Sequence, residues 1–401
     1  MASSISLTGS RSRDLLRKAD FNCLKRMPEE ILRISCFHGM VPREGAEKVL
    51  VNDGAFLLRK TEYQNEERFV LSVNYHGYVH HIIIDYSAGK WHFTGGRAGS
   101  LQELIRYYMS TGEPVHQSGA VLLYPTPRPS YYILHEDVEV NKKLGGGQFG
   151  DIYVGTLRCS EHKFECAVKK LKGKMQKQRR ADFMKEALTM LELDHPNVIK
   201  LYGVAIEQDP TMIIMELAPG GSLRDFLAKK SEKDVPTSVL IDFANGAICG
   251  MCYLSSRKII HRDIAARNCL LGYKNELKIG DFGLSVAGEG KYRSQKLESL
   301  PVKWLAPETL RNGEFSTKSD VWSFGILLWE IFSRCRSEPF PRLTKEEAKH
   351  VILSGERPMN APNGMPQLYA GVMERCFSQH PSSRMGFDAM YRVVQMGASR
   401  W

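Results

Sequence analysis

A charged loop between two apolar pairs constrains the fold of this 401-residue chain more than any other stretch. Ile259-Ile260 precedes the loop and Leu270-Leu271 follows it, which predicts two short buried strands. Between them lie Asp263, Arg267 and Asn268. A carboxylate and an amide this close in sequence can serve one site as proton acceptor and metal ligand. We interpret Asp263 and Asn268 in these roles; a polar turn between two strands is the alternative.

Composition predicts a folded protein of two or three domains. The chain is 43% hydrophobic and 25% charged, and no apolar run is long enough for a membrane span. The start, Met1-Ala2-Ser3-Ser4, is followed by basic residues without an apolar stretch, so we expect neither a signal peptide nor myristoylation. Nine scattered cysteines favour a reducing compartment, either cytoplasmic or nuclear.

The net charge of +10 is moderate for this length. Residues 1–30, rich in Ser, Arg and Lys, are predicted to form a basic flexible tail. The densest basic run, residues 169–180, lacks interleaved aromatic residues, so we expect no nucleic-acid partner. Peripheral attraction to an acidic membrane surface or an acidic partner stays open.

Residues 35–125 predict a small sheet flanked by two helices. Strand patterns occur at residues 55–59, 69–74 and 79–86, and helical patterns begin near residue 43 and residue 101. Arg59 does not suit a structural role, because it closes the apolar strand Phe56-Leu57-Leu58 and needs an anion there.

Phe56-Leu57-Leu58-Arg59, with Phe37-His38-Gly39 before the first helix, resembles the Src homology 2 domain. The resemblance implies a pocket in which tyrosine-phosphorylated proteins bind, with Arg59 holding the phosphate bidentately. It also implies that three further residues contact the phosphate: Arg43, Thr61 and His80. His81 is the alternative to His80 if the alignment shifts by one residue. Cys36 stands where the family usually has tryptophan.

A short proline-rich linker, residues 126–137, leads to a second domain at residues 138–396. This domain begins with three predicted strands, and its first turn is glycine-rich, spanning residues 145–150. A strand pattern follows the turn, which argues against a dinucleotide-binding fold, where a helix follows. Backbone N–H groups of a glycine-rich hairpin can lie over a triphosphate. Lys169 then follows on an apolar strand, and Glu186 on the next helix is its candidate ion-pair partner.

After Ser222 the pattern is mostly helical. Asp281 follows an apolar strand and precedes Phe282-Gly283, so it can turn inward and form a two-ligand oxygen site with Asn268. Residues 320–333 are apolar nearly all round, which predicts a buried central helix. Glu308 and Arg384 are candidates for a structural ion pair.

The order and spacing of these motifs resemble the protein-kinase fold, so we expect an α+β multidomain protein in which an antiparallel sheet with two helices precedes a bilobal kinase fold. The resemblance implies ATP and Mg²⁺, with Mn²⁺ an alternative. It implies a catalytic set of Asp263, Lys169, Arg267 and Glu186 and metal ligands Asn268 and Asp281. It implies an ATP site made of Gly145, Gly146, Gly147, Gln148, Phe149, Gly150, Ile152, Ala167, Lys169, Met215, Glu216 and Leu217.

Ala265 and Arg267 after the catalytic aspartate, with Leu300-Pro301-Val302-Lys303-Trp304, resemble the tyrosine-kinase subgroup. The order of the two modules is similar to the Fes/Fer family of non-receptor tyrosine kinases, without that family's long N-terminal region. The resemblance implies tyrosine-containing protein substrates and a cytoplasmic protein with membrane or cell-junction association. Tyr292 is the predicted autophosphorylation site, and Arg262 is expected to hold its phosphate. A catalytically weak phosphotyrosine-binding scaffold is the alternative function.

Overall fold

The computed structural model describes residues 29–63, 66–146, 150–159, 162–171, 177–288, 290–294, 300–356 and 358–398. The chain forms two compact units. The first comprises residues 1–164, 168–181 and 203–213, and the second comprises residues 165–167, 182–202 and 214–401.

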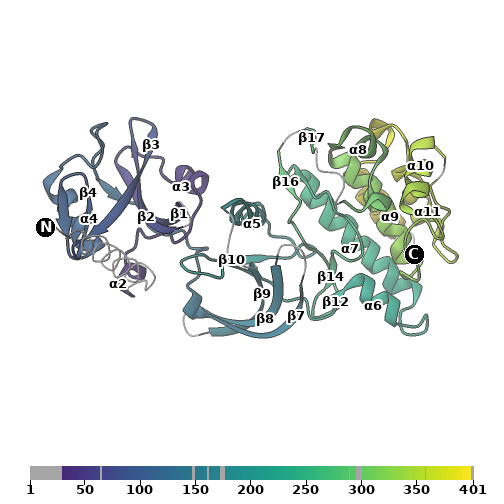
Figure 1. Ribbon diagram of the computed structural model, residues 1–401. Helices are drawn as coiled ribbons and strands as arrows, with labels where there is room; N and C mark the ends of the chain where they lie inside the picture. Colours follow the sequence, from purple (N-terminus) through teal and green to yellow (C-terminus); the bar gives the residue numbers. More distant parts are fainter. Residues whose placement is uncertain are drawn as a thin grey trace, which may run out of the picture. The chain divides into compact units, whose positions relative to one another are not determined.

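A six-stranded sheet with the order β5-β4-β3-β2-β1-β6 begins the first unit (Figure 1). Its strands are β1 (Ala55–Tyr63), β2 (Glu66–Tyr75), β3 (Tyr78–Ser87), β4 (Lys90–Phe93), β5 (Gly96–Ala98) and β6 (Tyr124–Pro125). The strands β1 to β5 pair antiparallel, and β6 pairs parallel with β1. The accompanying helices are α2 (Glu29–Leu32), α3 (Arg43–Val49) and α4 (Leu101–Thr111). The antiparallel sheet with helices is therefore confirmed, although β1 continues beyond Arg59, its predicted end.

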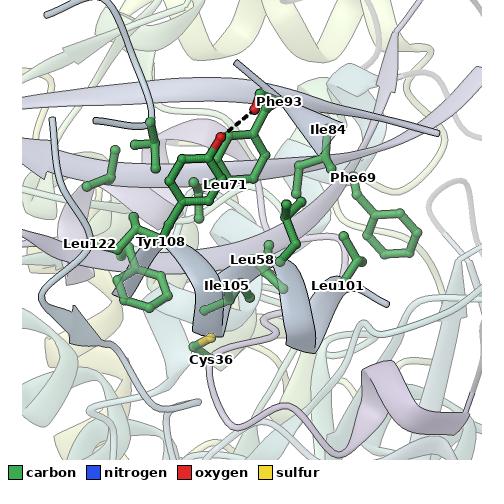
Figure 2. Packing of buried hydrophobic residues seen from close by; sticks show 14 of the residues in the cluster. Cys36, Leu58, Phe69, Leu71, Ile84, Phe93, Leu101, Ile105, Tyr108 and Leu122 are labelled. Carbon is green, nitrogen blue, oxygen red and sulfur yellow. Dashed lines mark hydrogen bonds between the residues drawn. The ribbon is translucent and has the colours of Figure 1, made fainter. Parts of the chain in front are cut away.

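The core of this part lies where β1, β2 and β3 meet α4 (Figure 2). The Tyr108 ring of α4 stacks on Phe93 at 4.6 Å between centroids, and its hydroxyl donates to the Phe93 carbonyl oxygen at 2.7 Å. Cys36 is buried in the same cluster. The small thiol at this position is thus enclosed by larger apolar side chains of the sheet and α4.

The segment before α3 also packs within the first unit. The backbone N–H of Met40 donates to the Ile206 carbonyl oxygen at 2.7 Å. A Cβ atom at Gly39 would approach that same oxygen to 2.5 Å, and Gly39 has a φ of +62°. Both facts require glycine at this position.

A five-stranded sheet with the order β10-β11-β9-β8-β7 follows. Its strands are β7 (Val138–Gly146), β8 (Gly150–Cys159), β9 (His162–Leu171), β10 (Leu201–Ala205) and β11 (Met212–Met215), and the accompanying helix is α5 (Lys177–Met190). The sequence pattern predicted that this helix ends at Leu193, but in the structure it ends at Met190. The turn η1 (His135–Asp137) leads into β7.

The second unit is mainly helical (Figure 1). Its helices are α6 (Leu223–Lys229), α7 (Thr237–Ser256), α8 (Pro307–Asn312), α9 (Thr317–Phe332), α10 (Lys345–Ser354), α11 (Gln367–Cys376) and α12 (Phe387–Ala398), with the turns η2 (Val302–Trp304) and η3 (Pro381–Ser383). Its short strands are β12 (Gly221–Ser222), β13 (Ile259–Ile260), β14 (Cys269–Leu271), β15 (Leu277–Ile279), β16 (Val286–Ala287), β17 (Tyr292–Arg293) and β18 (Glu314–Phe315).

Helix α9 is the central element of this unit, as predicted. Every residue from Ser319 to Phe332 is buried, and α7 and α11 pack against the helix. Among the described helices, α7 is the one whose length and composition would suit a membrane span. Half of its apolar window is buried, and the helix packs against α9, α12 and β15, as a core helix of a folded domain does.

Candidate active site and phosphate-binding pocket

The two strands that frame the charged loop are anchored in different sheets. β13 pairs with β16, whereas β14 pairs with β12 and β15. The apolar pairs thus form buried strands, as predicted, but they do not pair with each other. The loop between them connects two parts of the second unit that hold its ends independently.

A buried carboxylate from α9 holds the start of the loop. Asp320 accepts the backbone N–H of His261 at 2.7 Å and that of Arg262 at 2.9 Å. Burial raises the pKa of Asp320 to about 7, although both backbone bonds favour its ionised form. The sequence did not reveal this role. The available signal was a charged residue inside a segment that is otherwise apolar all round.

The three polar residues of the loop converge. Asn268 donates from Nδ2 to the backbone oxygen and to Oδ2 of Asp263, at 2.7 Å in each case. The Arg267 guanidinium donates to Oδ1 of the same carboxylate. Asp263 is therefore oriented from both sides. Because the Asn268 nitrogen faces Asp263, the Asn268 amide oxygen is the atom left for a ligand.

Asp281 follows the strand that pairs with β14. The backbone N–H of Gly280 donates to the Asn268 backbone oxygen at 2.9 Å, so the chain brings Asp281 next to Asn268 in the register. Asp281 has a φ of +58°, and Phe282 is buried after it. His261 accepts the Asp263 N–H at Nδ1 and lies 3.0 Å from the Gly280 oxygen at Nε2, so its Nε2–H donates there.

The donor atoms here suit a hard divalent cation. Asp281 supplies a carboxylate and Asn268 an amide oxygen, the ligand type that Mg²⁺ prefers. In the described part of the chain, no cluster of three or more His, Cys, Asp or Glu side chains could hold a metal ion. The pair of Asp281 and Asn268 therefore suits an ion that takes its other ligands from water and phosphate oxygens.

A second buried carboxylate of α9, Glu330, supports the far side of the loop. It accepts the backbone N–H of Ala266 at 2.9 Å and the indole N–H of Trp304 at 3.1 Å. The Arg267 guanidinium lies 4.6 Å from the centre of the Trp304 ring. Arg267 is thus held between the Asp263 carboxylate and an aromatic face, an arrangement that residue order alone could not indicate.

Arg262 lies beside the predicted autophosphorylation site. Its guanidinium carbon is 4.6 Å from the centre of the Tyr292 ring and 4.2 Å from that of Phe315. One guanidinium nitrogen donates to the Leu284 carbonyl oxygen at 3.0 Å, while the buried Nε has no hydrogen-bond partner within the described residues. Tyr292 is 38% exposed, and its strand β17 pairs with β18.

The predicted nucleotide-binding residues divide between the two units. In the first unit, Gly145 pairs with Ile152 and Gly146 with Asp151 in the β7–β8 hairpin. Any Cβ atom at Gly150 would collide with the Lys170 carbonyl oxygen. Residues 147–149, which include three of the predicted ATP-binding residues, lie outside the described chain.

Lys169 is buried on β9 in the first unit. Ala167 and Glu186 are buried residues of the second unit, and Glu186 lies on α5. The ion pair between Lys169 and Glu186 stays a prediction.

Met215, the last residue of β11, is half-buried. The Glu216 carboxylate pairs with the buried Lys278 at 2.8 Å and accepts the Lys200 N–H at 3.2 Å. The Glu216 N–H donates to the Lys200 carbonyl oxygen at 2.9 Å. Leu217 is buried. A contact of Glu216 with adenine would therefore use its main-chain oxygen.

In the first unit, Arg59 is the centre of a polar cluster. It is 5% exposed, and burial lowers the pKa of its guanidinium to about 10, so the group stays charged at neutral pH. Its Nε donates to the Ser72 hydroxyl at 3.1 Å, and one terminal nitrogen lies 3.5 Å from Nδ1 of His81. The histidine beside Arg59 is therefore His81. His80, which the alignment favoured, points to the opposite face because successive side chains on a strand alternate.

Two further residues complete the cluster. Glu47 accepts from Nε of Arg43 at 2.9 Å and lies 3.2 Å from Nε2 of His81, and these contacts lower the pKa of its carboxyl. Thr61 lies two residues after Arg59 on β1 and so shares its face of the sheet. Ser72 and Glu47 were not singled out by the sequence, and His81 was named only as the alternative to His80.

Comparisons with known proteins agree with this geometry. The family model for protein tyrosine and serine/threonine kinases matches residues 138–394, and the SH2 domain model matches residues 36–108. Fer-related kinase 1 of Caenorhabditis elegans is 39% identical over 375 residues, covering 92% of this chain and 94% of that protein. The chain belongs to the Fes/Fer family of tyrosine kinases.

Two mammalian members of the family are longer than this chain. Tyrosine-protein kinase Fer of Homo sapiens is 40% identical over 363 residues, which cover 89% of this chain but 43% of that protein. The Mus musculus protein of the same name is 39% identical with the same coverage. The chain therefore spans less than half the length of these relatives.

Proposed function

We propose that the chain is a non-receptor protein tyrosine kinase that transfers the γ-phosphate of ATP to tyrosine hydroxyls of proteins. The observation that carries the proposal is the Asp263 carboxylate, oriented by Asn268 and Arg267 beside the strand that leads to Asp281. Phosphoryl transfer requires alignment and charge neutralisation more than covalent help. A fixed carboxylate next to two oxygen ligands supplies both.

Each residue has a distinct role in this reaction. Asp263 accepts the proton of the substrate hydroxyl, a contribution of ~10²–10⁴-fold for a positioned base. Asn268 and Asp281 would hold Mg²⁺ or Mn²⁺, which would neutralise charge on the phosphates. Lys169 and the backbone of the glycine-rich hairpin bind the phosphates of ATP, and Glu186 orients Lys169. Residues 215–217 border the adenine.

Tyrosine specificity is supported by the position of Arg267. Its guanidinium is held between Asp263 and the Trp304 ring. Trp304 ends the segment that follows Leu300-Pro301, where the tyrosine-kinase subgroup places its substrate platform. We infer that Arg267, fixed next to Asp263 on the side of Trp304, favours the longer phenol side chain of tyrosine over the shorter side chains of serine and threonine at Asp263.

The Src homology 2 domain, which we place at residues 35–125, is proposed to bind tyrosine-phosphorylated proteins at Arg59. A buried guanidinium supported by Ser72 and His81 is pre-organised for a phosphate dianion, with Arg43 and Thr61 at the edge of the pocket. This binding would recruit the kinase domain, residues 138–396, to its substrates. The corresponding location is the cytoplasm, with peripheral association at membranes or cell junctions.

A kinase assay with radiolabelled ATP tests the proposal. The chain should phosphorylate a tyrosine peptide and not the same peptide with serine or threonine in its place. Asp263→Asn and Lys169→Met should each abolish the transfer while phosphotyrosine-peptide binding is retained. Equal incorporation by both variants and the wild type would refute the assignment and leave a phosphotyrosine-binding scaffold.

A further inference from the structure

A tyrosine stands at the tip of the hairpin formed by β14 and β15. The Gly272 N–H donates to the Glu276 carbonyl oxygen at 3.0 Å, which closes the turn between the two strands. Tyr273 follows Gly272 in this turn and is 66% exposed, whereas Tyr292, the predicted autophosphorylation site, is 38% exposed. Tyr273 is therefore the more exposed of the two phenol side chains.

The open end of the same hairpin carries the two proposed metal ligands. β14 begins directly after Asn268, and β15 is followed by Gly280 and Asp281. Each strand has three residues, and all three are paired with the other strand. Because so short a ladder moves as one unit, a displacement of the tip at Tyr273 also displaces Asn268 and Asp281.

The Tyr273 hydroxyl connects this tip to β9. It donates to Oε2 of Glu165 at 3.0 Å. Ala167, a residue of the predicted ATP site, lies two residues after Glu165 and so shares its face of the strand. Burial, and then the hydrogen bond to Glu165, raise the pKa of Tyr273, so the hydroxyl keeps its proton and remains the donor. The bond thus links the hairpin that carries the metal ligands to the strand that carries Ala167.

A phosphate on Tyr273 would break this link. Phosphorylation removes the hydroxyl donor and places a charge of about −1.5 to −2 next to the Glu165 carboxylate. The two anionic groups repel each other, and because both side chains are exposed, the hairpin tip is free to move away from β9. Asn268 and Asp281 would then move relative to Ala167, which changes the distance between the metal ligands and the adenine side of the nucleotide site.

We propose that Tyr273 is a second site of tyrosine phosphorylation, at which a phosphate weakens nucleotide binding by separating Tyr273 from Glu165. The inference rests on the proposed kinase function. Asn268, which bonds to Asp263 at 2.7 Å, lies at the opposite end of the hairpin from Tyr273, so the transfer takes place between two copies of the chain. The Tyr273 oxygen forms a bond to the γ-phosphorus of ATP, and the bond from that phosphorus to the bridging oxygen breaks. ADP leaves, and the hydroxyl proton passes to Asp263 of the phosphorylating copy.

Phosphorylation of one full chain by another tests the site. The acceptor chain carries Asp263→Asn and Tyr292→Phe, so it is inactive and lacks the other predicted site, and the wild-type chain with MgATP supplies the phosphate. Mass spectrometry of the acceptor should find phosphate on Tyr273. Phosphate on Tyr292 of the wild-type chain without phosphate on Tyr273 overturns the inference and leaves the proposed function. No tyrosine phosphate on either chain overturns both.

Calorimetric titration with MgADP measures the consequence for nucleotide binding. The Kd of the acceptor should rise about threefold after phosphorylation. The matched control is the acceptor with the further change Tyr273→Phe, which retains every other tyrosine of the acceptor and should have the same Kd before and after treatment. Comparing each chain with itself cancels the effect of losing the hydroxyl. An unchanged Kd in the acceptor, or an equal rise in the control, overturns the inference.

Reversing one charge assigns the effect to the contact with Glu165. Glu165→Lys in the acceptor places a cation opposite the phosphate, so phosphorylation should no longer raise the Kd for MgADP. Glu139→Lys, the same change at an exposed residue of β7, should leave the threefold rise in place. A rise that persists with Glu165→Lys, or that disappears equally with Glu139→Lys, overturns the inference.

Discussion

The Asp320 carboxylate at the start of α9 accepts the backbone N–H of Arg262 at 2.9 Å. Arg262 has a φ of +72°, a left-handed conformation that costs a non-glycine residue roughly 1–2 kcal/mol. The central helix thus holds the start of the loop that carries Asp263 in a conformation that the loop would not adopt alone.

Asp320→Asn should therefore loosen the loop. The amide can replace one acceptor oxygen but presents N–H groups to a backbone donor, which leaves a buried donor unsatisfied and costs about 1–3 kcal/mol. Chemical unfolding should show this loss, and kcat should fall with it. Asp242→Asn, an exposed change on α7, is the control, and equal effects of the two changes would contradict the role of Asp320.

The same carboxylate predicts opposite effects of pH on stability and activity. The pKa of Asp320 is raised to about 7, so the folded chain holds a proton there that the unfolded chain releases near pH ~4. The stability of the wild type relative to Asp320→Asn should fall as pH rises from about 4 to about 7 and then level off. Activity relative to the variant should instead rise as the pH passes through about 7, where Asp320 of the folded chain ionises, because the loop requires the ionised acceptor. Thermal melts and kinase assays of both proteins from below the unfolded pKa to above the folded pKa test the prediction; a flat stability difference would contradict it.

Loss of Arg59 should abolish phosphopeptide binding even when the charge is kept. Arg59→Lys removes the bidentate geometry and the bond to Ser72, and we expect a loss of about 2–4 kcal/mol in binding free energy. Arg43→Lys should cost far less, since the Arg43 side chain is 58% exposed and pairs with Glu47. Titration calorimetry with one phosphopeptide compares the two. Equal losses would place the phosphate elsewhere.

Tyr292→Phe should lower kinase activity without affecting ATP binding. The phosphate on Tyr292 is expected to pair with Arg262, whose buried Nε has no other hydrogen-bond partner within the described chain. We expect at least about a fivefold reduction in kcat after preincubation with ATP, and none before it. Steady-state assays with and without preincubation distinguish an effect of Tyr292 phosphorylation from an effect of the substitution itself. An unchanged rate after preincubation would exclude the switch.

Arg384→Met should be strongly destabilising. Arg384 forms two 2.7 Å bonds to the Glu308 carboxylate, and its side chain is fully buried, which confirms the predicted structural ion pair. Removing one partner of a buried pair costs about 3–5 kcal/mol. The matched control is Arg392→Met, which breaks an exposed pair with Asp388 and should cost under ~0.5 kcal/mol. Urea unfolding measures both, and similar midpoints would refute the prediction.

Sequence reasoning succeeded where the relevant residues are close along the chain. Asp263, Arg267 and Asn268 lie on one loop, and the structure brings their side chains into contact. Sequence reasoning assigned the histidine beside Arg59 to His80, one residue away from His81. Neighbouring side chains on a strand point to opposite faces, and the pattern of apolar residues in this strand does not define which face meets Arg59.

Partners distant in sequence were not predictable. Asp320 and Glu330 support the loop that carries Asp263 across roughly 60 residues of chain, and the sequence shows only that they interrupt an apolar helix.

The amino-acid sequence by itself determined the two modules, their order and the residue types that the chemistry needs, because these depend on short-range patterns of charge, glycine and apolar spacing. Only the tertiary structure decided which histidine meets Arg59, which carboxylates hold the loop and where Arg267 lies, because hydrogen bonds and burial between distant segments set those positions.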